Sequence, residues 1–492
     1  MPRYARTIAL TALVAGCAAV GPNYTAPPAP RSARYTHEEL PAATASAPVH
    51  LGSAQRFAAS ANAAPDWWRT FGSAHLDALV DEALANNPTL EAARATLRQA
   101  RETYAAQAGS TLYPTVTGKL GVSRNQSNAA GSGQPGDNQT VYSLYNANVG
   151  VAYNVDLFGG NRRTLEGLAA QADYQQYQLE AARLAIAGNV ATAAFTQAQF
   201  SAQRDATQSI LTAQRDQLAI ARQRFELGAT SRADVLALET QTEQTRARLP
   251  ALESQIEQAN HLLAILTGRE PGDATIPHFT LDEFELPATL PVVVPSDLVR
   301  QRPDIQASAA LLHAATAQYG VAVANLYPQV NLSASLGAQA LTAGALFGPG
   351  SAIWSLAGGL AQPLFNAGLK SAASAAEAGL QAAGANYRET VLQALRNVAD
   401  ALRALDADAR VLDAQVAADT AANGALALTS DQYQLGGASY LQLLVAQLQA
   451  QQTRIGVIEA QAQRLADSAS LFQAVGGGVT MSAAQEKTAR TE

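Results

Sequence analysis

The residues most able to do chemistry are few in this chain of 492 residues, and they do not form a catalytic pattern. The six histidines are scattered along the sequence, at His37, His50, His75, His261, His278 and His313. They lack the close spacing of metal ligands, and no HExxH, P-loop or GxSxG stretch occurs. A single cysteine, Cys17, excludes an internal disulfide and a cysteine-based zinc site. We therefore expect no catalytic residue, no metal and no cofactor, and we do not expect an enzyme.

Cys17 is placed for covalent lipidation instead. Arg3 and Arg6 precede the apolar run TIALTALVAG at 7–16, which is too short to span a bilayer as a helix and predicts a signal peptide over 1–16. The stretch LVAGC resembles the lipobox of bacterial lipoproteins, whose cysteine is diacylated, exposed by cleavage and acylated again. Ala18 stands where a retention-type aspartate occurs in that motif, which favours the outer membrane. The alternative is an ordinary signal peptide with an incidental cysteine.

Composition narrows the class of protein. Charged residues make up 15% and aromatics 6%, whereas the hydrophobic class reaches 48% and is rich in alanine, a mixture typical of long, closely packed helices. The net charge of -7 and the lack of a dense Lys/Arg cluster give no reason to expect nucleic-acid binding. No later segment approaches 18 consecutive apolar residues, so a membrane crossing by the mature chain requires strands in a closed barrel.

The chain is a tandem duplication. NLYPQV at 325–330 repeats the TLYPTV of 111–116, and PLFNAGL at 363–369 repeats the DLFGGNR of 156–162. Proline disfavours a helical conformation for the residue before it and is tolerated at the first position of a strand. Leu-Tyr-Pro therefore predicts a helix-to-strand switch in each copy, and Leu-Phe predicts the return to helix.

These switches predict six regions along the chain. They are a signal peptide (1–16), a lipidated N-terminal linker (17–75), a first repeat (76–270), an equatorial connector (271–296), a second repeat (297–475) and a C-terminal tail (476–492). The first repeat is predicted to contain a helix over about 76–112, strands over about 114–124 and 140–155, and helices over 161–226 and 232–267. The second is predicted to contain a helix, strands over about 328–340 and 353–363, and helices over 367–434 and 440–474.

The predicted strands are about ten residues long and alternate between apolar and polar positions, as transmembrane strands around a wet lumen do. In the first strand, Val116, Leu120 and Val122 alternate with threonine, lysine and serine. Four strands cannot close a membrane barrel, whereas a trimer supplies twelve. A soluble four-stranded sheet packed on helices is the alternative. The long helices argue against it, because 161–226 would run about 100 Å. Coiled-coil seams that step by three and four residues are also predicted over 235–266, 391–416 and 441–472, and the last of these begins with Leu441, Leu444 and Leu448.

The two turns between long helices have similar sequences, FELGATSRADVL and YQLGGASYLQLL. Gly228 and Gly436 are predicted to take the left-handed conformation that ends a helix, with Thr230 or Ser231, and Ser439, capping the next one. We expect these tips to dock a partner as well as to turn the chain. The docking residues predicted are Gly228, Ala229, Thr230, Gly436, Gly437, Ala438 and Ser439.

Taken together, these marks resemble the TolC-type outer-membrane factors, and within them the NodT-like lipoprotein exit ducts of RND-type tripartite multidrug efflux systems. The lipobox, VGPNYTAPPAP (20–30), DWWRTFGSAHLDALVDEALANNP (66–88) and LPVVVPSDLVRQRPDI (290–305) carry the resemblance, which covers the mature chain. It implies a mainly α protein with membrane β-strands, whose homotrimer forms a 12-stranded β-barrel on a periplasmic α-barrel. It also implies a Gram-negative outer membrane, contact with its lipids, a periplasmic adaptor and an inner-membrane RND-type transporter.

The resemblance also implies an aperture that is closed by tip residues. Asp234 and Tyr433 match two positions of the network that holds relatives closed. Many relatives place an acid where this chain has Val445, and some also place an acid where it has Gln442 and an arginine where it has Ala438. An acidic ring is therefore not expected; our hypothesis is that Leu441 and Val445 form an apolar constriction that closes by dewetting.

Two other functions remain open alternatives. One is a trimeric, structural coiled-coil surface protein, although two internal strand pairs favour a duct over such a fibre. The other is an exit duct for protein secretion. The lipobox and the VGPNY start favour the efflux of drugs or other small toxic compounds.

Overall fold

The computed structural model describes residues 19–32, 34–59, 63–128, 139–272 and 274–478. Cys17, the predicted signal peptide, part of the first interstrand loop and most of the predicted tail lie outside these residues. The chain forms two compact units, each assembled from both repeats. One comprises Met1–Pro27, Thr96–Gln175 and Ser308–Tyr387, and the other comprises Pro28–Ala95, Gln176–Ala307 and Arg388–Glu492. We call them the sheet unit and the hairpin unit.

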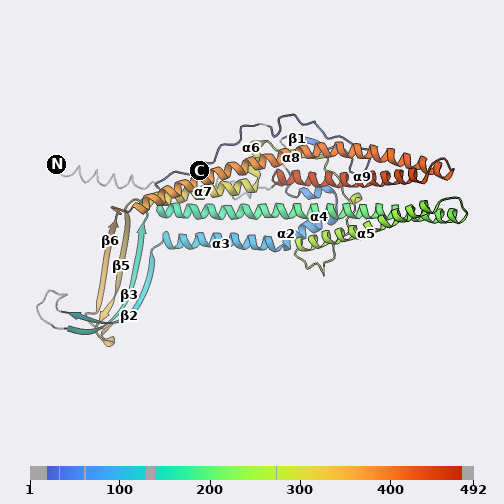
Figure 1. Ribbon diagram of the computed structural model, residues 1–492. Helices are drawn as coiled ribbons and strands as arrows, with labels where there is room; N and C mark the ends of the chain where they lie inside the picture. Colours follow the sequence, from blue (N-terminus) through green and yellow to red (C-terminus); the bar gives the residue numbers. More distant parts are fainter. Residues whose placement is uncertain (1–18, 33, 60–62, 129–138, 273, 479–492) are drawn as a thin grey trace. The chain divides into compact units, whose positions relative to one another are not determined.

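The order of helices and strands repeats once along the chain (Figure 1). The first half contains β1 (Arg56–Ala59), η1 (Trp67–Phe71), α2 (Ala74–Asn86), α3 (Pro88–Thr111), β2 (Thr115–Asn128), β3 (Gln139–Val155), α4 (Gly160–Glu226) and α5 (Arg232–Leu266). The second half contains β4 (Thr289–Val292), α6 (Pro295–Gln301), α7 (Pro303–Ala324), β5 (Gln329–Ala340), β6 (Ala352–Ala361), α8 (Ala367–Gln434) and α9 (Tyr440–Ala474). Short 3-10 turns lie at η3 (Leu281–Glu283) and η4 (Ala343–Ala345).

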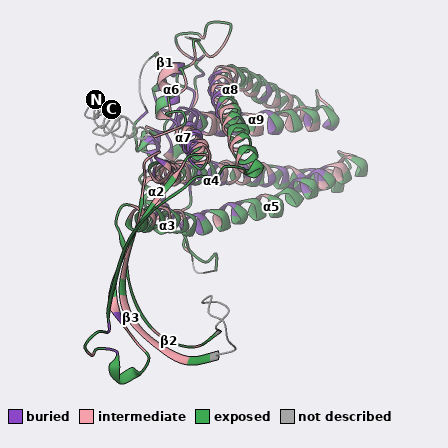
Figure 2. Ribbon diagram, turned by 90° about the vertical axis from the view of Figure 1, so that its left-hand side faces the viewer, coloured by how far each residue is buried: buried purple, intermediate pink, exposed green. Residues whose placement is uncertain are grey.

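The sheet unit contains one antiparallel sheet with the strand order β2-β3-β5-β6 (Figure 1). The two hairpins, one from each repeat, meet where β3 pairs with β5, with Val149 opposite Leu336. Apolar residues share one face, and many of them are exposed, including Leu120, Val122 and Leu356. Figure 2 shows β2 and β3 with hardly any buried residue. Among the described residues, β2 and β6 have only one neighbour each, so both edges of the sheet are open.

The structure differs from the prediction in three features. The single helix over about 76–112 is two helices, α2 and α3, because Pro88 forces Asn87 into an extended conformation with ψ of 125°. Pro303 breaks the start of the second repeat at Arg302 in the same way. The linker and the connector also contain strands that the sequence pattern did not indicate, since β1 pairs in parallel with β4.

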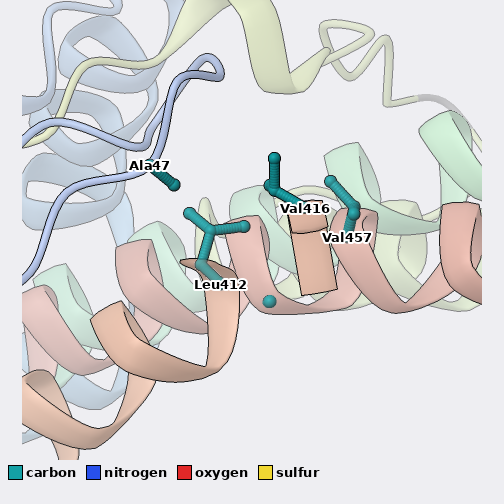
Figure 3. Packing of buried hydrophobic residues seen from close by; sticks show 5 residues of the cluster. Ala47, Leu412, Val416 and Val457 are labelled. Atoms are coloured by element: carbon teal, nitrogen blue, oxygen red, sulfur yellow. The ribbon is translucent and has the colours of Figure 1, made fainter. Parts of the chain in front are cut away.

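The hairpin unit is held together by aromatic and aliphatic packing. Trp67 stacks on Phe472 at 5.5 Å between ring centroids, and Phe71 packs against Phe195 at 5.0 Å. A second cluster joins the linker to α8 and α9 through Ala47, Leu412, Val416, Val457 and Ala460 (Figure 3). In the predicted seam over 391–416, every seam residue except the half-buried Leu395 is buried, which confirms that part of the coiled-coil prediction.

A buried arginine fixes the linker to α9 within the hairpin unit. Arg464 is almost completely buried and donates hydrogen bonds to the carbonyl oxygens of Leu51 (2.7 Å) and Ser53 (2.9 Å). Asp408 of α8 lies near it, where burial and the adjacent carboxylate of Asp467 raise the pKa of Asp408 to about 8. The linker is therefore part of the folded unit.

A second arginine holds the N-terminal segment within the sheet unit. Arg163 of α4 donates to the Asn23 side chain at 2.6 Å and pairs with Glu166 at 2.7 Å. Glu166 also accepts a hydrogen bond from His313 of α7, whose ring stacks on Tyr24 at 4.4 Å. In the part of the chain that the structure describes, no helix is both long and apolar enough to cross a bilayer.

Candidate gate at the helical tips

The two turns between long helices are built in the same way (Figure 1). Gly228 (φ 71°) and Gly436 (φ 79°) both adopt the left-handed conformation, as predicted. The following residue closes each helix, because the N–H of Ala229 donates to Arg224 O (2.8 Å) and that of Gly437 donates to Gln432 O (2.7 Å). A Cβ atom at either glycine would meet nothing within 4 Å, so the backbone conformation alone requires glycine.

Both hairpins then start their second helix with a capping box. At α5, Ser231 Oγ accepts from the Asp234 N–H (3.1 Å), and the Asp234 carboxylate accepts from the Ser231 N–H (3.2 Å). At α9, Ser439 and Gln442 make the same reciprocal pair, at 3.4 and 2.7 Å. Ser231, and not Thr230, is therefore the cap of α5. Asp234 and Gln442 occupy equivalent positions at the two tips.

The Asp234 carboxylate has further local partners. It accepts hydrogen bonds from the hydroxyls of Ser231 (2.7 Å) and Thr230 (3.1 Å). The Ser231 hydroxyl is the main cause that lowers the pKa of Asp234 from its usual value. Asp234 is thus the ionised partner of Ser231 in the capping box, and these hydrogen bonds of its carboxylate stay within its own hairpin.

An aromatic cluster joins the two hairpins beside these caps. Tyr433 of α8 packs edge-on against Tyr440 of α9, with ring centroids 6.2 Å apart, and Arg224 of α4 lies 5.5 Å from the Tyr433 ring. Tyr440 is only 6% exposed and also contacts the buried cluster of Leu218, Ala221 and Leu238. Burial, followed by the charges of Tyr433 and Asp234, raises the pKa of Tyr440 to about 12. Tyr433 therefore packs directly on Tyr440, and the charge of Asp234 acts on the same group through the raised pKa of Tyr440.

The structure separates the other predicted gate residues from this cluster. Leu441 and Val445 are 68% and 58% exposed and lie one turn apart on the same face of α9. The predicted seam is wrong at this end of α9, because Tyr440 and Leu443 are buried in place of Leu441 and Leu448. Arg224 and Tyr440 were not singled out from the sequence. The available signal was an aromatic residue directly after the predicted cap Ser439.

The tips expose apolar residues and contain no arrangement suited to catalysis. Leu227 and Leu435, each directly before a tip glycine, are almost fully exposed. Within the described ranges, no group of three histidine, cysteine or acidic side chains is placed to hold a metal ion.

The family model described as outer membrane efflux protein matches residues 79–269 and 294–477. The chain belongs to the outer membrane efflux protein family. It is therefore an outer-membrane channel component of efflux systems and not an enzyme.

Similar proteins agree with this family. The antibiotic efflux pump outer membrane protein ArpC of Pseudomonas putida is 29% identical over 96% of this chain and 95% of its own length. Outer membrane protein OprJ of Pseudomonas aeruginosa is 29% identical over 97% and 96%. The structure of the outer-membrane channel OprN matches with a TM-score of 0.84 and 26% identity, covering 93% of this chain and 99% of OprN. The open state of the Neisseria gonorrhoeae MtrE channel matches with a TM-score of 0.79 and 26% identity over 94% and 99%.

Proposed function

We propose that three copies of this chain assemble into a gated exit duct of a tripartite efflux pump. The observation that carries the proposal is the sheet with two open edges, β2 and β6, and an exposed apolar face. An open edge of ten or more residues is unstable in a lipid bilayer, because its N–H and C=O groups find no water there. Three copies pairing edge to edge satisfy these groups in a closed ring of twelve strands.

The duct is proposed to close at the helical tips. Asp234 completes the capping box of Ser231 at the start of α5, and Tyr433 with Tyr440 holds the α8–α9 hairpin against α4 through Arg224. Leu441 and Val445 project from the exposed face of α9, where three copies would bring them together in an apolar constriction that excludes water. Opening then requires the tyrosine cluster to separate.

The partners proposed are a periplasmic adaptor and an inner-membrane RND-type transporter. The exposed tips Gly228–Thr230 and Gly436–Ser439, with Leu227 and Leu435, offer the adaptor two similar apolar surfaces. Relatives that are named for antibiotic, toluene and pyoverdine export support drugs and other small organic compounds as the exported class.

We also propose that Cys17 carries a lipid in the outer membrane. Residue Val20, three positions later, is bonded through its N–H to Phe158 O at 3.0 Å, next to the end of β3. The described chain is therefore held at the end of the strands three positions after Cys17 in the sequence, which supports an anchor at the membrane. Incorporation of labelled palmitate that is lost in Cys17→Ser tests this assignment; labelling that persists would contradict it.

The mass of the purified oligomer in detergent, from light scattering corrected for bound detergent, tests the assembly. We expect three copies. A stable monomer would overturn the proposal, since one chain has too few strands to close. Trimers that never conduct ions in a planar bilayer would favour a structural surface fibre over a duct.

A further inference from the structure

The sheet contains one junction between the two repeats, and its two open edges are the strands that correspond, by the duplication, to the two strands of that junction. Inside the chain, β3 of the first repeat pairs with β5 of the second. By the duplication, β6 corresponds to β3, and β2 corresponds to β5. The β3–β5 junction is therefore an internal template for pairing β6 of one copy with β2 of another.

The template specifies a register. Leu157-Phe158 recurs as Leu364-Phe365, 207 positions later, and the Leu-Tyr-Pro at 112–114 recurs 214 positions later at 326–328. In the template, Asn148 lies opposite Gly337. The residue of β6 that corresponds to Asn148, 207 positions later, is Ser355. The residue of β2 that corresponds to Gly337, 214 positions earlier, is Ser123, so the template sets these two serines opposite each other.

We propose that β6 of one copy pairs antiparallel with β2 of the next in the register that sets Ser355 opposite Ser123. This inference rests on the proposed trimer and adds to it the residues that meet at each of its three seams. The same register sets Leu356 opposite Val122 and Leu360 opposite Gly118.

Independently of the duplication, the pattern of side chains supports the pairing of faces in this register, because it excludes a slip by an odd number of residues. Leu356 and Leu360 lie on the exposed apolar face of β6, and Val122 lies on the apolar face of β2. The proposed pairs keep these residues on one face, and the serines on the other. A slip by one residue would turn the apolar side chains of one strand to the polar face of its neighbour.

An aromatic contact at the strand ends supports it again. Within the chain, Phe158 stacks on Tyr327 with ring centroids 4.8 Å apart and 26° between the planes. The equivalent residues, Phe365 and Tyr113, are 93% and 67% exposed in the single chain, whereas Tyr327 is 40% exposed. Pairing of β6 with β2 brings Phe365 of one copy next to Tyr113 of the next copy. The two rings can then stack as Phe158 and Tyr327 do within one chain.

A third observation concerns a charge on the apolar face. Arg124 lies on the same face of β2 as Leu120 and Val122. An apolar face is an unfavourable position for a cation. The register sets Arg124 opposite Trp354, whose side chain is 78% exposed on the apolar face of β6. Stacking of a guanidinium on an indole is favourable, and tryptophan and arginine are suited to the water boundary of a bilayer.

Cysteine cross-linking of the full-length protein in membranes tests the register. Ser123→Cys combined with Ser355→Cys should give disulfide-linked dimers and trimers on a denaturing gel, which disappear on reduction. The matched negative pair, Ser123→Cys with Ala357→Cys, is displaced by two residues and keeps the same face. Ser335→Cys with Ser355→Cys is the positive control, because these serines lie opposite each other within one chain and should link without forming oligomers.

The outcomes separate this inference from the trimer itself. Preferential linking of the 123/355 pair supports the register. Preferential linking of the 123/357 pair, with the mass of a trimer, overturns the register and leaves the proposed duct in place. A third outcome overturns both the register and the proposed assembly. In that outcome neither pair links although the 335/355 control does, and the mass is that of a monomer.

Discussion

The two helical tips share a backbone and differ in charge. Both turn at a left-handed glycine and restart with a serine capping box, yet the reciprocal partner is the carboxylate Asp234 at one tip and the neutral amide Gln442 at the other. Duplication has thus kept the turn and changed its electrostatics. The first tip gains an interaction between a negative charge and the helix N-terminus, and the second depends on the burial of Tyr440.

The largest expected effect follows from that burial. Tyr440→Ala removes a 6%-exposed aromatic side chain and should destabilise the α8–α9 tip by about 3 kcal/mol. Hydrogen exchange measured by mass spectrometry should show faster exchange across the tip. The adjacent control Leu441→Ala, at an exposed position, should leave exchange almost unchanged. Equal effects of the two changes would contradict the assigned packing.

The next largest loss of stability is expected from changes in the capping boxes. Asp234→Ala removes the charged partner of the cap and should cost roughly 0.5–1 kcal/mol at the first tip. Gln442→Ala should cost less at the second tip, since an amide makes no charge–dipole interaction. Hydrogen exchange over the first turns of α5 and α9 compares them directly. Equal losses of stability at the two tips would mean that the charge of Asp234 does not stabilise its capping box.

Acid should distinguish the same two tips. The folded pKa of Asp234 is lowered, so its contribution is present above the unfolded pKa of about 3.9 and is lost as the pH falls through the folded pKa. The protection of the first tip, measured relative to the intrinsic exchange rate at each pH, should therefore fall in acid, while the cap at Gln442, which does not titrate, keeps its protection. In Asp234→Asn the acid response should be absent; an unchanged response would place its origin elsewhere.

A pH effect of opposite sign is expected away from the tips. Burial raises the folded pKa of Asp408 to about 8, so this group favours folding below its unfolded pKa of about 3.9. That contribution is lost as the pH rises toward and through 8. Thermal unfolding of Asp408→Asn should show a shallower decline over this range than the natural chain. An identical decline would exclude Asp408 as its cause.

Much of the fold was predictable because its signals are local. Leu-Tyr-Pro and the tip glycines act through backbone geometry, and the alternation of residues such as Val116 and Leu120 indicates which faces the strands share. Burial of Arg464 and the pairing of β1 with β4 were not predictable, since both depend on partners hundreds of residues away. At the tips, glycines and caps followed from the pattern. Tyr440 did not, because its burial is set by packing across two hairpins.

The central claim is that the tips close a duct. Single-channel conductance of the purified trimer in a planar bilayer tests it most directly, comparing the natural chain with Tyr440→Ala and with the exposed surface control Arg410→Ala. The account predicts small, flickering currents for the natural chain and the control, and a large, steady conductance for Tyr440→Ala. A natural chain that is already fully open, or a conductance that Tyr440→Ala does not change, would contradict closure by the tyrosine cluster.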